Sequence, residues 1–248
     1  MNQTKYHFDD FTHAEYEKLL ITAKENFMFC NYKTIDKSVR SIIWRHDVDF
    51  SMHEAYNLAV IENRQGIIAT YFLMLHCEFY NLMEKEISDL VKKIIDLGHQ
   101  IGIHFDSHYY GITDQNNLAK HLKFEKHILS ELFNTDIQAF SFHNTTEFTM
   151  SCKEWEYADL INTYANLFQS EFDYCSDSNG YWRFNRLKDI VAVKEGKSLQ
   201  VLTHPEWWTP KVMSPKEKID RCIFGRAKSN QTFYANTLIK FQRENIDW

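Results

Sequence analysis

The stretch that decides the fold reads SIIWRHDVDFSMHE and covers residues 41–54. Residues 41–46 form a β-rich apolar run, which predicts a buried strand. Ser51 and Glu54 stand three residues apart as a hydroxyl and a carboxylate, which is the spacing of a capping box at the start of a helix. The stretch therefore predicts a strand that leads through a short polar segment into a helix.

The residues that follow complete a strand–helix–strand unit. The helix is expected to run from Met52 to about Gln65, and Gly66 fits the left-handed cap that ends many helices. Residues 67–75 are rich in β-branched and aromatic side chains, which favours a second strand. Because two strands joined by a helix lie parallel in one sheet, this unit predicts an α/β fold.

The same alternation continues along the chain. Further helices are expected at about 87–95, 114–132 and 215–244, the last with a break near Gly225. Further strands are expected at 100–103, 139–142, 189–193 and 199–203, whereas the aromatic segment 150–187 shows no clear pattern. Since no repeat or linker interrupts the alternation, we expect a single domain over residues 1–248, with a helical extension at about 1–40 and C-terminal helices at about 215–246.

Composition and charge narrow the class of protein. The 248 residues are 44% hydrophobic and 25% charged, which is ordinary for a globular domain. The net charge of −6, without a block of Lys or Arg, disfavours a nucleic-acid groove. No run approaches the apolar length of a membrane span, and the start of the chain lacks the apolar core of a signal peptide. Five cysteines without a CxxC pair disfavour a disulfide framework or a cysteine-based zinc site. We therefore expect a cytoplasmic protein with reduced thiols.

Several polar side chains stand at the ends of predicted strands. In parallel α/β folds, ligands bind at the carboxyl ends of the strands. The polar residues at those ends are Asp47, Asp49, His104, His108, His143 and His204. Their common position predicts one shared site.

The spacing of these residues indicates what such a site could do. Asp47 and Asp49 are two apart in a strand, so both carboxylates point to one face and repel unless a cation or a proton lies between them. His104 and His108 are four apart and can converge on one ion, and with Asp49 they form a His₂Asp set with an open position for water. The alternatives are helix capping for the aspartates, unrelated polar residues for the histidines and a loop residue for His204.

Three segments resemble, in order, the motifs of the polysaccharide deacetylases (NodB homology, carbohydrate esterase family 4). They are RHDVD at 45–49, GHQIGIHFDSH at 98–108 and LTHP at 202–205. The resemblance spans roughly residues 40–210 and implies a distorted (β/α)₇ barrel that performs metal-dependent amide hydrolysis. The set is most similar to an offshoot of this family that occurs in surface-polysaccharide (O-antigen or capsule) gene clusters.

The resemblance also implies roles for individual residues. Asp47 matches the catalytic base, His204 matches the general acid, and Leu202 matches the apolar residue of the acetyl pocket. The ligands of a divalent metal are matched by Asp49, His104 and His108. The expected metal is zinc, with cobalt, manganese or iron as alternatives, because all of them suit imidazole and carboxylate ligands.

Two features depart from the family pattern. Val48 separates two aspartates that are commonly adjacent, and the arginine of the third motif is replaced by the segment 141–144, which reads SFHN. Arg45 and Arg183 are therefore the candidates to orient Asp47. The fourth motif is matched only loosely, by residues 177–182. The candidate substrate-binding residues are His143, Arg183, Trp182, Trp207, Trp208 and Tyr109, and the neighbouring Tyr110 is a further aromatic candidate.

The leading hypothesis is a metal-dependent hydrolase that removes an N-acyl group, acetyl or formyl, from an amido sugar or sugar precursor in surface-polysaccharide biosynthesis. The expected substrate is an intracellular precursor linked to a nucleotide or a lipid. The alternatives are a hydrolase of a non-sugar amide and a catalytically degenerate family member that binds carbohydrate or a partner. A zinc nucleobase deaminase is excluded because its HxE…PCxxC signature is absent. The sequence does not indicate an oligomeric state.

Overall fold

The centre of the computed structural model, which describes residues 2–246, is a nine-stranded sheet. The strands are β1 (Met28–Cys30), β2 (Ser41–Val48), β3 (Thr70–Leu73), β4 (Gln100–Asp106), β5 (Ala139–His143), β6 (Glu156–Tyr157), β7 (Leu160–Asn162), β8 (Phe172–Ser176) and β9 (Ser198–Thr203). The helices are α1 (Asn2–Lys5), α2 (His13–Asn26), α3 (Met52–Arg64), α4 (Lys85–Asp96), α5 (Gln115–Phe133), α6 (Glu147–Ser151), α7 (Asn166–Glu171), α8 (Leu187–Val191) and α9 (Pro215–Lys240), with short 3₁₀ turns η1 (Phe8–Asp10), η2 (Ser178–Gly180) and η3 (Pro205–Trp207).

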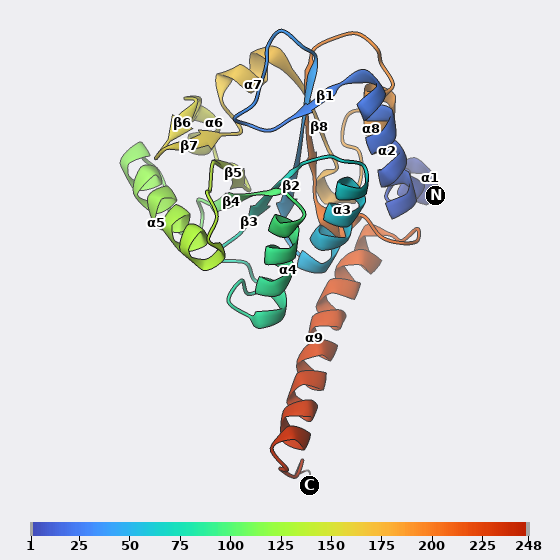
Figure 1. The fold of residues 1–248 in the computed structure, drawn as a ribbon, viewed down its shortest axis with the longest axis vertical. Coiled ribbons are helices and arrows are strands. Elements are labelled where there is room, and N and C mark those ends of the chain that lie inside the picture. Colours follow the sequence, from blue (N-terminus) through green and yellow to red (C-terminus); the bar gives the residue numbers. More distant parts are fainter. Residues whose placement is uncertain (1, 247–248) are drawn as a thin grey trace.

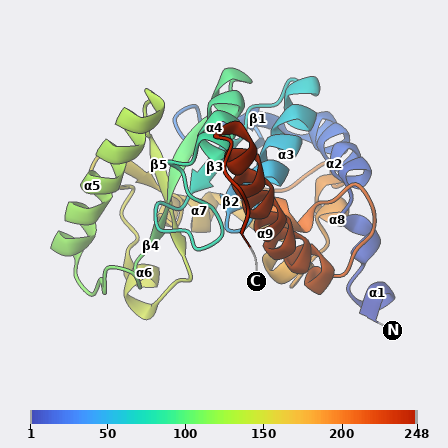
Figure 2. The same cartoon turned by 90° about the horizontal axis from the view of Figure 1, so that it is seen from below.

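The sheet has the order β6-β7-β5-β4-β3-β2-β9-β8, and β1 pairs with the start of β2. All neighbours are parallel except β6 and β7, so seven strands of this path form one parallel series. The main helices lie around the outside of the sheet (Figures 1 and 2). The α/β class and the seven parallel strands expected for a distorted (β/α)₇ barrel are therefore confirmed.

The sheet is strongly curled. Strands β2 and β5 are separated by two others, which in a flat sheet would place them about 14 Å apart. Nevertheless, Ser141 Oγ of β5 donates a hydrogen bond of 2.9 Å to Asp47 Oδ2 of β2. This contact requires the sheet to bend back on itself, and it places the carboxyl ends of distant strands around one interior space.

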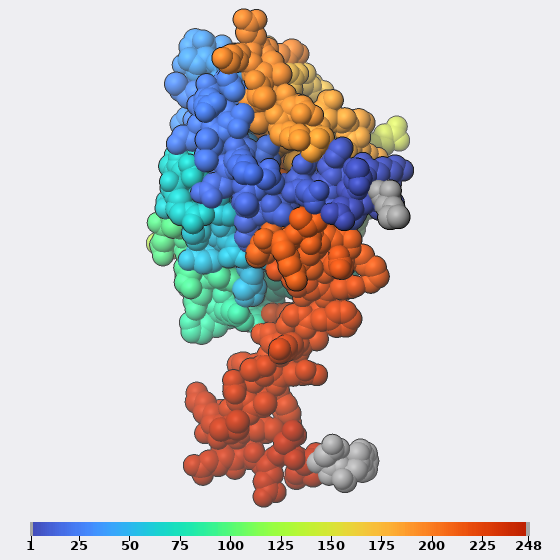
Figure 3. Space-filling view, turned by 90° about the vertical axis from the view of Figure 1, so that its right-hand side faces the viewer, coloured from blue at the N-terminus to red at the C-terminus, as the bar shows by residue number. Residues whose placement is uncertain are grey.

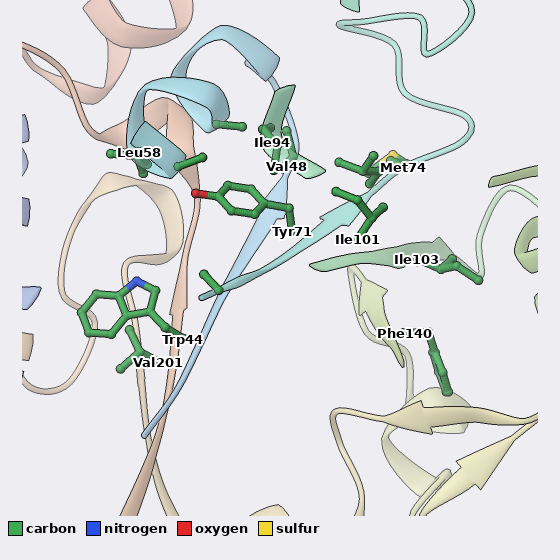
Figure 4. Close-up of a cluster of buried hydrophobic side chains, with 14 of the residues drawn as sticks. Trp44, Val48, Leu58, Tyr71, Met74, Ile94, Ile101, Ile103, Phe140 and Val201 are labelled. Carbon is green, nitrogen blue, oxygen red and sulfur yellow. The ribbon is translucent and has the colours of Figure 1, made fainter. Parts of the chain in front are cut away.

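A continuous apolar core holds the helices on the sheet. All eight residues of β2 are buried, because helices cover one face and the interior of the curled sheet covers the other. In Figure 4, Leu58 of α3 and Ile94 of α4 gather around Tyr71 of β3, and the cross-strand partners Trp44 and Val201 lie together below them. Burying each of these side chains contributes about 1.5–3 kcal/mol.

A glycine is needed at position 102, because β4 lies very close to β3 and β5 there. A Cβ atom at this position would overlap the ring of Phe72, its partner on β3, and would lie 2.9 Å from the backbone oxygen of Ala139 on β5. Only a residue without a side chain therefore allows Phe72 to cover this part of the sheet.

One expected strand is wrong, and one observed strand was not expected. The strand expected at 189–193 is wrong, because α8 occupies 187–191 and buries Leu187 and Val191, one helical turn apart, against the core. A short apolar run fits either element, so tertiary contacts decided the outcome. Strand β8 lies in the segment that showed no pattern, because only two of its five residues are buried.

The ends of the chain also differ from expectation. Helix α9 continues without a break at Gly225, where nothing lies within 4 Å of an added Cβ atom. The helical extension ends at Asn26, after which β1 joins the sheet. None of the helices within residues 2–246 has both the length and the apolar character that a membrane crossing needs.

Candidate active site

A cavity of about 990 Å³ opens at the carboxyl ends of the parallel strands. Its lining includes Asp47 at the end of β2, Asp49 just after it, His104 of β4, His143 of β5 and His204 after β9. The predicted convergence of strand-end polar residues is therefore found for these five side chains.

Three of these side chains present their ligand atoms to one another. His104 Nε2 lies 3.1 Å from Asp49 Oδ1 and 3.1 Å from His143 Nδ1, and His143 Nδ1 lies 3.5 Å from Asp49 Oδ1. Within residues 2–246, this is the group of ligand-type side chains that is close enough to hold a metal ion. We call it the Asp49–His104–His143 triangle.

The triangle fits a divalent cation. Tetrahedral zinc with bonds of about 2.0–2.1 Å separates its ligand atoms by roughly 3.4 Å, close to the three distances found here. Asp49 Oδ1 is buried and makes no hydrogen bond within the described residues. Burial alone would raise the pKa of Asp49, but the adjacent imidazoles of His104 and His143 outweigh this and hold the pKa well below its usual range. Asp49 is thus ionised at neutral pH, which is the form that can bind a cation.

His108 is placed elsewhere. Strand β4 continues to Asp106, so the spacing of four residues from His104 to His108 crosses a strand end and does not follow a helical turn. Asp106 Oδ1 accepts hydrogen bonds from the backbone of His108 and Tyr109, and His108 Nε2 lies 2.8 Å from the backbone oxygen of Asn144. The structure therefore places His143 next to Asp49 and His104, whereas the sequence motif predicted His108 there.

Asp47 is buried and held on one oxygen. Its Oδ2 accepts the hydrogen bond from Ser141 and lies 3.7 Å from Arg45 Nη2 and 3.7 Å from His104 Nδ1. Its other oxygen, Oδ1, is buried and has no hydrogen-bond partner within residues 2–246. The carboxylate is thus anchored through Oδ2 and keeps Oδ1 free.

Arg45 is the arginine that the structure places beside Asp47. Its side chain is buried, donates through Nη1 to Thr163 Oγ1, and lies between the rings of Phe72 and Tyr164 at 5.7 and 5.5 Å. Arg183, the other candidate, lies at the cavity lining and is exposed. Arg45 therefore supplies the buried positive charge that balances Asp47.

His204 is oriented by a buried carboxylate. Asp177 is fully buried after β8 and accepts hydrogen bonds from His204 Nδ1 at 2.7 Å, from the His204 backbone at 3.0 Å and from Trp208 Nε1 at 2.8 Å. His204 Nε2 then faces Asp49 Oδ2 at 4.0 Å. Burial by itself would lower the pKa of His204, but Asp177 and then Asp49 outweigh it and raise the pKa to about 10.

The candidate substrate-binding residues fall into two groups. Leu202, Tyr109, Trp207 and Arg183 line the cavity together with His143. Trp182 and Trp208 do not line it, because Trp182 stacks on Phe11 and donates to Asp10, and Trp208 is fully buried beneath Asp177. These two tryptophans pack against Phe11 and each other.

Two side chains of the site were given no role from the sequence. Asp177 begins the segment 177–182 that matched the fourth motif only loosely, and it follows β8, the strand that showed no pattern, so its strand-end position was not recognised. Ser141 lies in the SFHN segment that stands where the family arginine is expected, and a hydroxyl across the curled sheet takes part of that role. Its alternation with His143 on β5, which directs both to one face, is the signal that could have found it.

No family model matches the chain, and no curated protein matches it in sequence. Several solved structures are similar in fold. A family 4 carbohydrate esterase from Bacillus anthracis is 15% identical, over 86% of each chain, with a TM-score of 0.45. The chitin deacetylase of the fungal pathogen Colletotrichum lindemuthianum is 13% identical over 74% of this chain and 81% of its own, with a TM-score of 0.44. BA3943, a family 4 pseudoenzyme from Bacillus anthracis, is 12% identical over 77% of this chain and 61% of its own, with a TM-score of 0.41.

Proposed function

We propose that this protein is a metal-dependent hydrolase that removes an N-acyl group, acetyl or formyl, from an amido sugar or sugar precursor. The observation that carries the proposal is that three groups line one cavity. They are the Asp49–His104–His143 triangle, the buried carboxylate of Asp47 with one free oxygen, and His204, which is oriented by a second carboxylate. These are the three parts that amide hydrolysis by a metal, a base and an acid requires.

Asp49, His104 and His143 would hold the cation. When bound, a divalent ion such as zinc polarises an amide carbonyl and makes a water molecule a stronger acid. Zinc is the first choice for one carboxylate and two imidazoles, and cobalt, manganese and iron are the alternatives.

Asp47 acts as the base. Because Ser141 and Arg45 hold Oδ2, the free oxygen Oδ1 is the atom that accepts a proton from the attacking water. The same contacts keep the carboxylate in one orientation, so a proton is received without rearrangement of the side chain.

His204 acts as the acid. Asp177 binds Nδ1, so Nε2, on the side of Asp49, carries the proton that goes to the leaving amine when the carbon–nitrogen bond breaks. The products are then the free carboxylic acid and the amino sugar.

The cavity has the size of a site for a small carbohydrate with part of its carrier. Leu202 lines the cavity and suits the methyl or hydrogen of a short acyl group, and Trp207 and Tyr109, which also line it, offer ring faces to a sugar. A nucleotide- or lipid-linked precursor of a surface polysaccharide is the substrate that we propose. The cytoplasmic location stays a prediction.

The test combines metal analysis with product release. The purified protein should contain about one divalent ion per chain and should release acetate or formate from at least one member of a panel of nucleotide-linked amido sugars. Asp47→Asn and His204→Asn should each lower turnover by roughly 10²–10⁴ and keep the metal, because neither residue belongs to the triangle.

Other outcomes of this test separate the alternatives. Release of acid only from ureides or formamides would replace the sugar substrate with a non-sugar amide. Binding of sugars without any release, in protein that contains its metal, would identify a degenerate member and contradict the proposed activity.

A further inference from the structure

Helix α9 leaves the body of the protein. Figures 1 and 3 show it standing away from the rest of the chain after its first turns pack near η3. It is 26 residues long, and Lys218 is its only buried residue. The residues of α9 beyond Gly225 therefore pack hardly at all against the apolar core.

The accessible surface of the chain is larger than expected for a compact protein of its mass. A compact monomer of 29.7 kDa is expected to expose roughly 11,600 Å², whereas this chain exposes 13405 Å². The excess is about 1,800 Å², and a standard interface needs only about 800 Å² from each partner. The projecting helix thus offers enough surface for a stable association.

The helix is also poorly suited to stand alone in water. Residues 229–237 read SNQTFYANT, a segment of mostly weak helix formers, and Gly225 precedes it. Isolated helices are marginal even for good helix formers, and most helical stability in proteins comes from packing. The distal half of α9 therefore needs a partner surface to remain helical.

The exposed apolar residues of α9 do not share one face. Phe224 is 69% exposed and Phe233 is 74% exposed. They are nine residues apart, which at about 100° per residue places them on opposite sides of the helix. A flat surface would cover only one of them, so the partner must present a groove or two surfaces.

The charge on α9 indicates which kind of surface the helix binds. From Arg221 to Arg243 the sequence contains five basic residues and no acidic one, whereas the whole chain carries −6. Arg221 pairs with Glu54 and Arg226 pairs with Glu84, but Lys228, Lys240 and Arg243 form no ion pair within residues 2–246. Two α9 helices side by side would repel each other, whereas the acidic body of another copy is complementary to α9.

We infer that α9 is a dimerisation arm that packs on the body of a second copy of this chain. A reciprocal exchange of two arms closes the assembly with twofold symmetry and covers both sides of each helix. This inference is independent of the proposed hydrolase activity and is tested without measuring it.

The test is the molar mass of the full chain in solution, by light scattering and sedimentation over a dilution series. The native protein should have twice the chain mass. The double variant Phe224→Glu/Phe233→Glu should dissociate at a concentration about 30-fold higher or more, which is the effect of losing one interface hot spot. Because both residues are exposed, the variant should keep the circular dichroism of the body and its metal content.

Matched controls are Phe224→Leu and Phe233→Leu, which keep an apolar side chain at the same two exposed positions. They should stay dimeric. Lys228→Glu/Lys240→Glu should also weaken the dimer and reduce its dependence on salt, since it removes the charge attraction.

Three results would overturn the inference. They are a native chain that is monomeric at every concentration, a dimer that the α9 glutamate substitutions leave unchanged, and a monomer that binds anionic lipid vesicles through α9. The last would make a membrane surface the occupant.

Discussion

At the scale of single residues, the chemistry of the candidate site depends on which atoms of Asp47 and His204 make no hydrogen bond to neighbouring residues. Ser141 and Arg45 occupy Oδ2 of Asp47 and leave Oδ1 free, and Asp177 occupies Nδ1 of His204 and leaves Nε2 free. In the proposed mechanism, the hydrogen bonds around Asp47 and His204 therefore determine which atom accepts the proton and which atom donates it.

The identity of the third metal ligand can be decided by two matched substitutions. His143→Ala should remove the metal from the purified protein, because it deletes one corner of the Asp49–His104–His143 triangle. His108→Ala should keep it, because His108 contacts Asn144 at the surface. Elemental analysis after dialysis measures both. Loss of metal in the His108 variant alone would mean that the sequence motif, and not the observed triangle, identifies the ligand.

The anchor of the base gives a second prediction. Ser141→Ala should lower kcat by roughly 10- to 100-fold, because a hydrogen bond to a charged group is worth about 1.5–3 kcal/mol. KM and metal content should not change, since Ser141 contacts Asp47 Oδ2 and not the triangle. Ser107→Ala is the control, because its hydroxyl is buried without a hydrogen-bond partner within residues 2–246. Equal kcat values in the two variants would show that Asp47 needs no anchor from β5.

At the scale of secondary-structure elements, strand β4 can carry His104 only if its neighbours approach closely. Gly102→Ala should lower the free energy of unfolding by about 1–3 kcal/mol, the usual cost of overpacking, because the methyl group would overlap Phe72. Gly225→Ala is the control, since that position is helical and open, and should not destabilise the protein. Urea unfolding midpoints measure both. An unchanged midpoint for Gly102→Ala would show that the ring of Phe72 moves freely.

The elements that could be predicted are those whose signal is local. The unit β2–α3–β3 could be recognised because a capping box and a closing glycine flank an apolar pattern, and helix α3 begins at Met52 as expected. Helix α8 and strand β8 could not, because their short sequences fit more than one conformation and contacts with distant residues select among them.

At the scale of the whole molecule, stability should depend on pH through Glu125 of α5. Burial raises the pKa of this carboxyl to about 8, above its ordinary value of 4.5. A raised pKa means that the folded state holds a proton that the unfolded state releases. This contribution is complete below about pH 4.5 and is lost as the pH rises through 8.

The matching experiment compares the native chain with Glu125→Gln, which is neutral at every pH. The free energy of unfolding of the variant relative to the native protein should increase between pH 5 and pH 8, by at most about 1.4 kcal/mol per pH unit. Urea unfolding at several pH values measures this difference. Parallel stability curves for the two proteins would contradict a neutral, buried Glu125.

The sequence by itself determined the α/β class, the parallel strands around 41–75 and the polar residues at the strand ends. These depend on hydrophobic period, capping and spacing, which are properties of neighbours in the chain. The partners of each site residue were decided only by the tertiary structure. Ser141 meets Asp47, His143 replaces His108 beside His104, and Asp177 meets His204, because the sheet curls and brings distant strand ends within hydrogen-bond distance. Curvature is a property of the assembled sheet, so no local pattern in the sequence reports it.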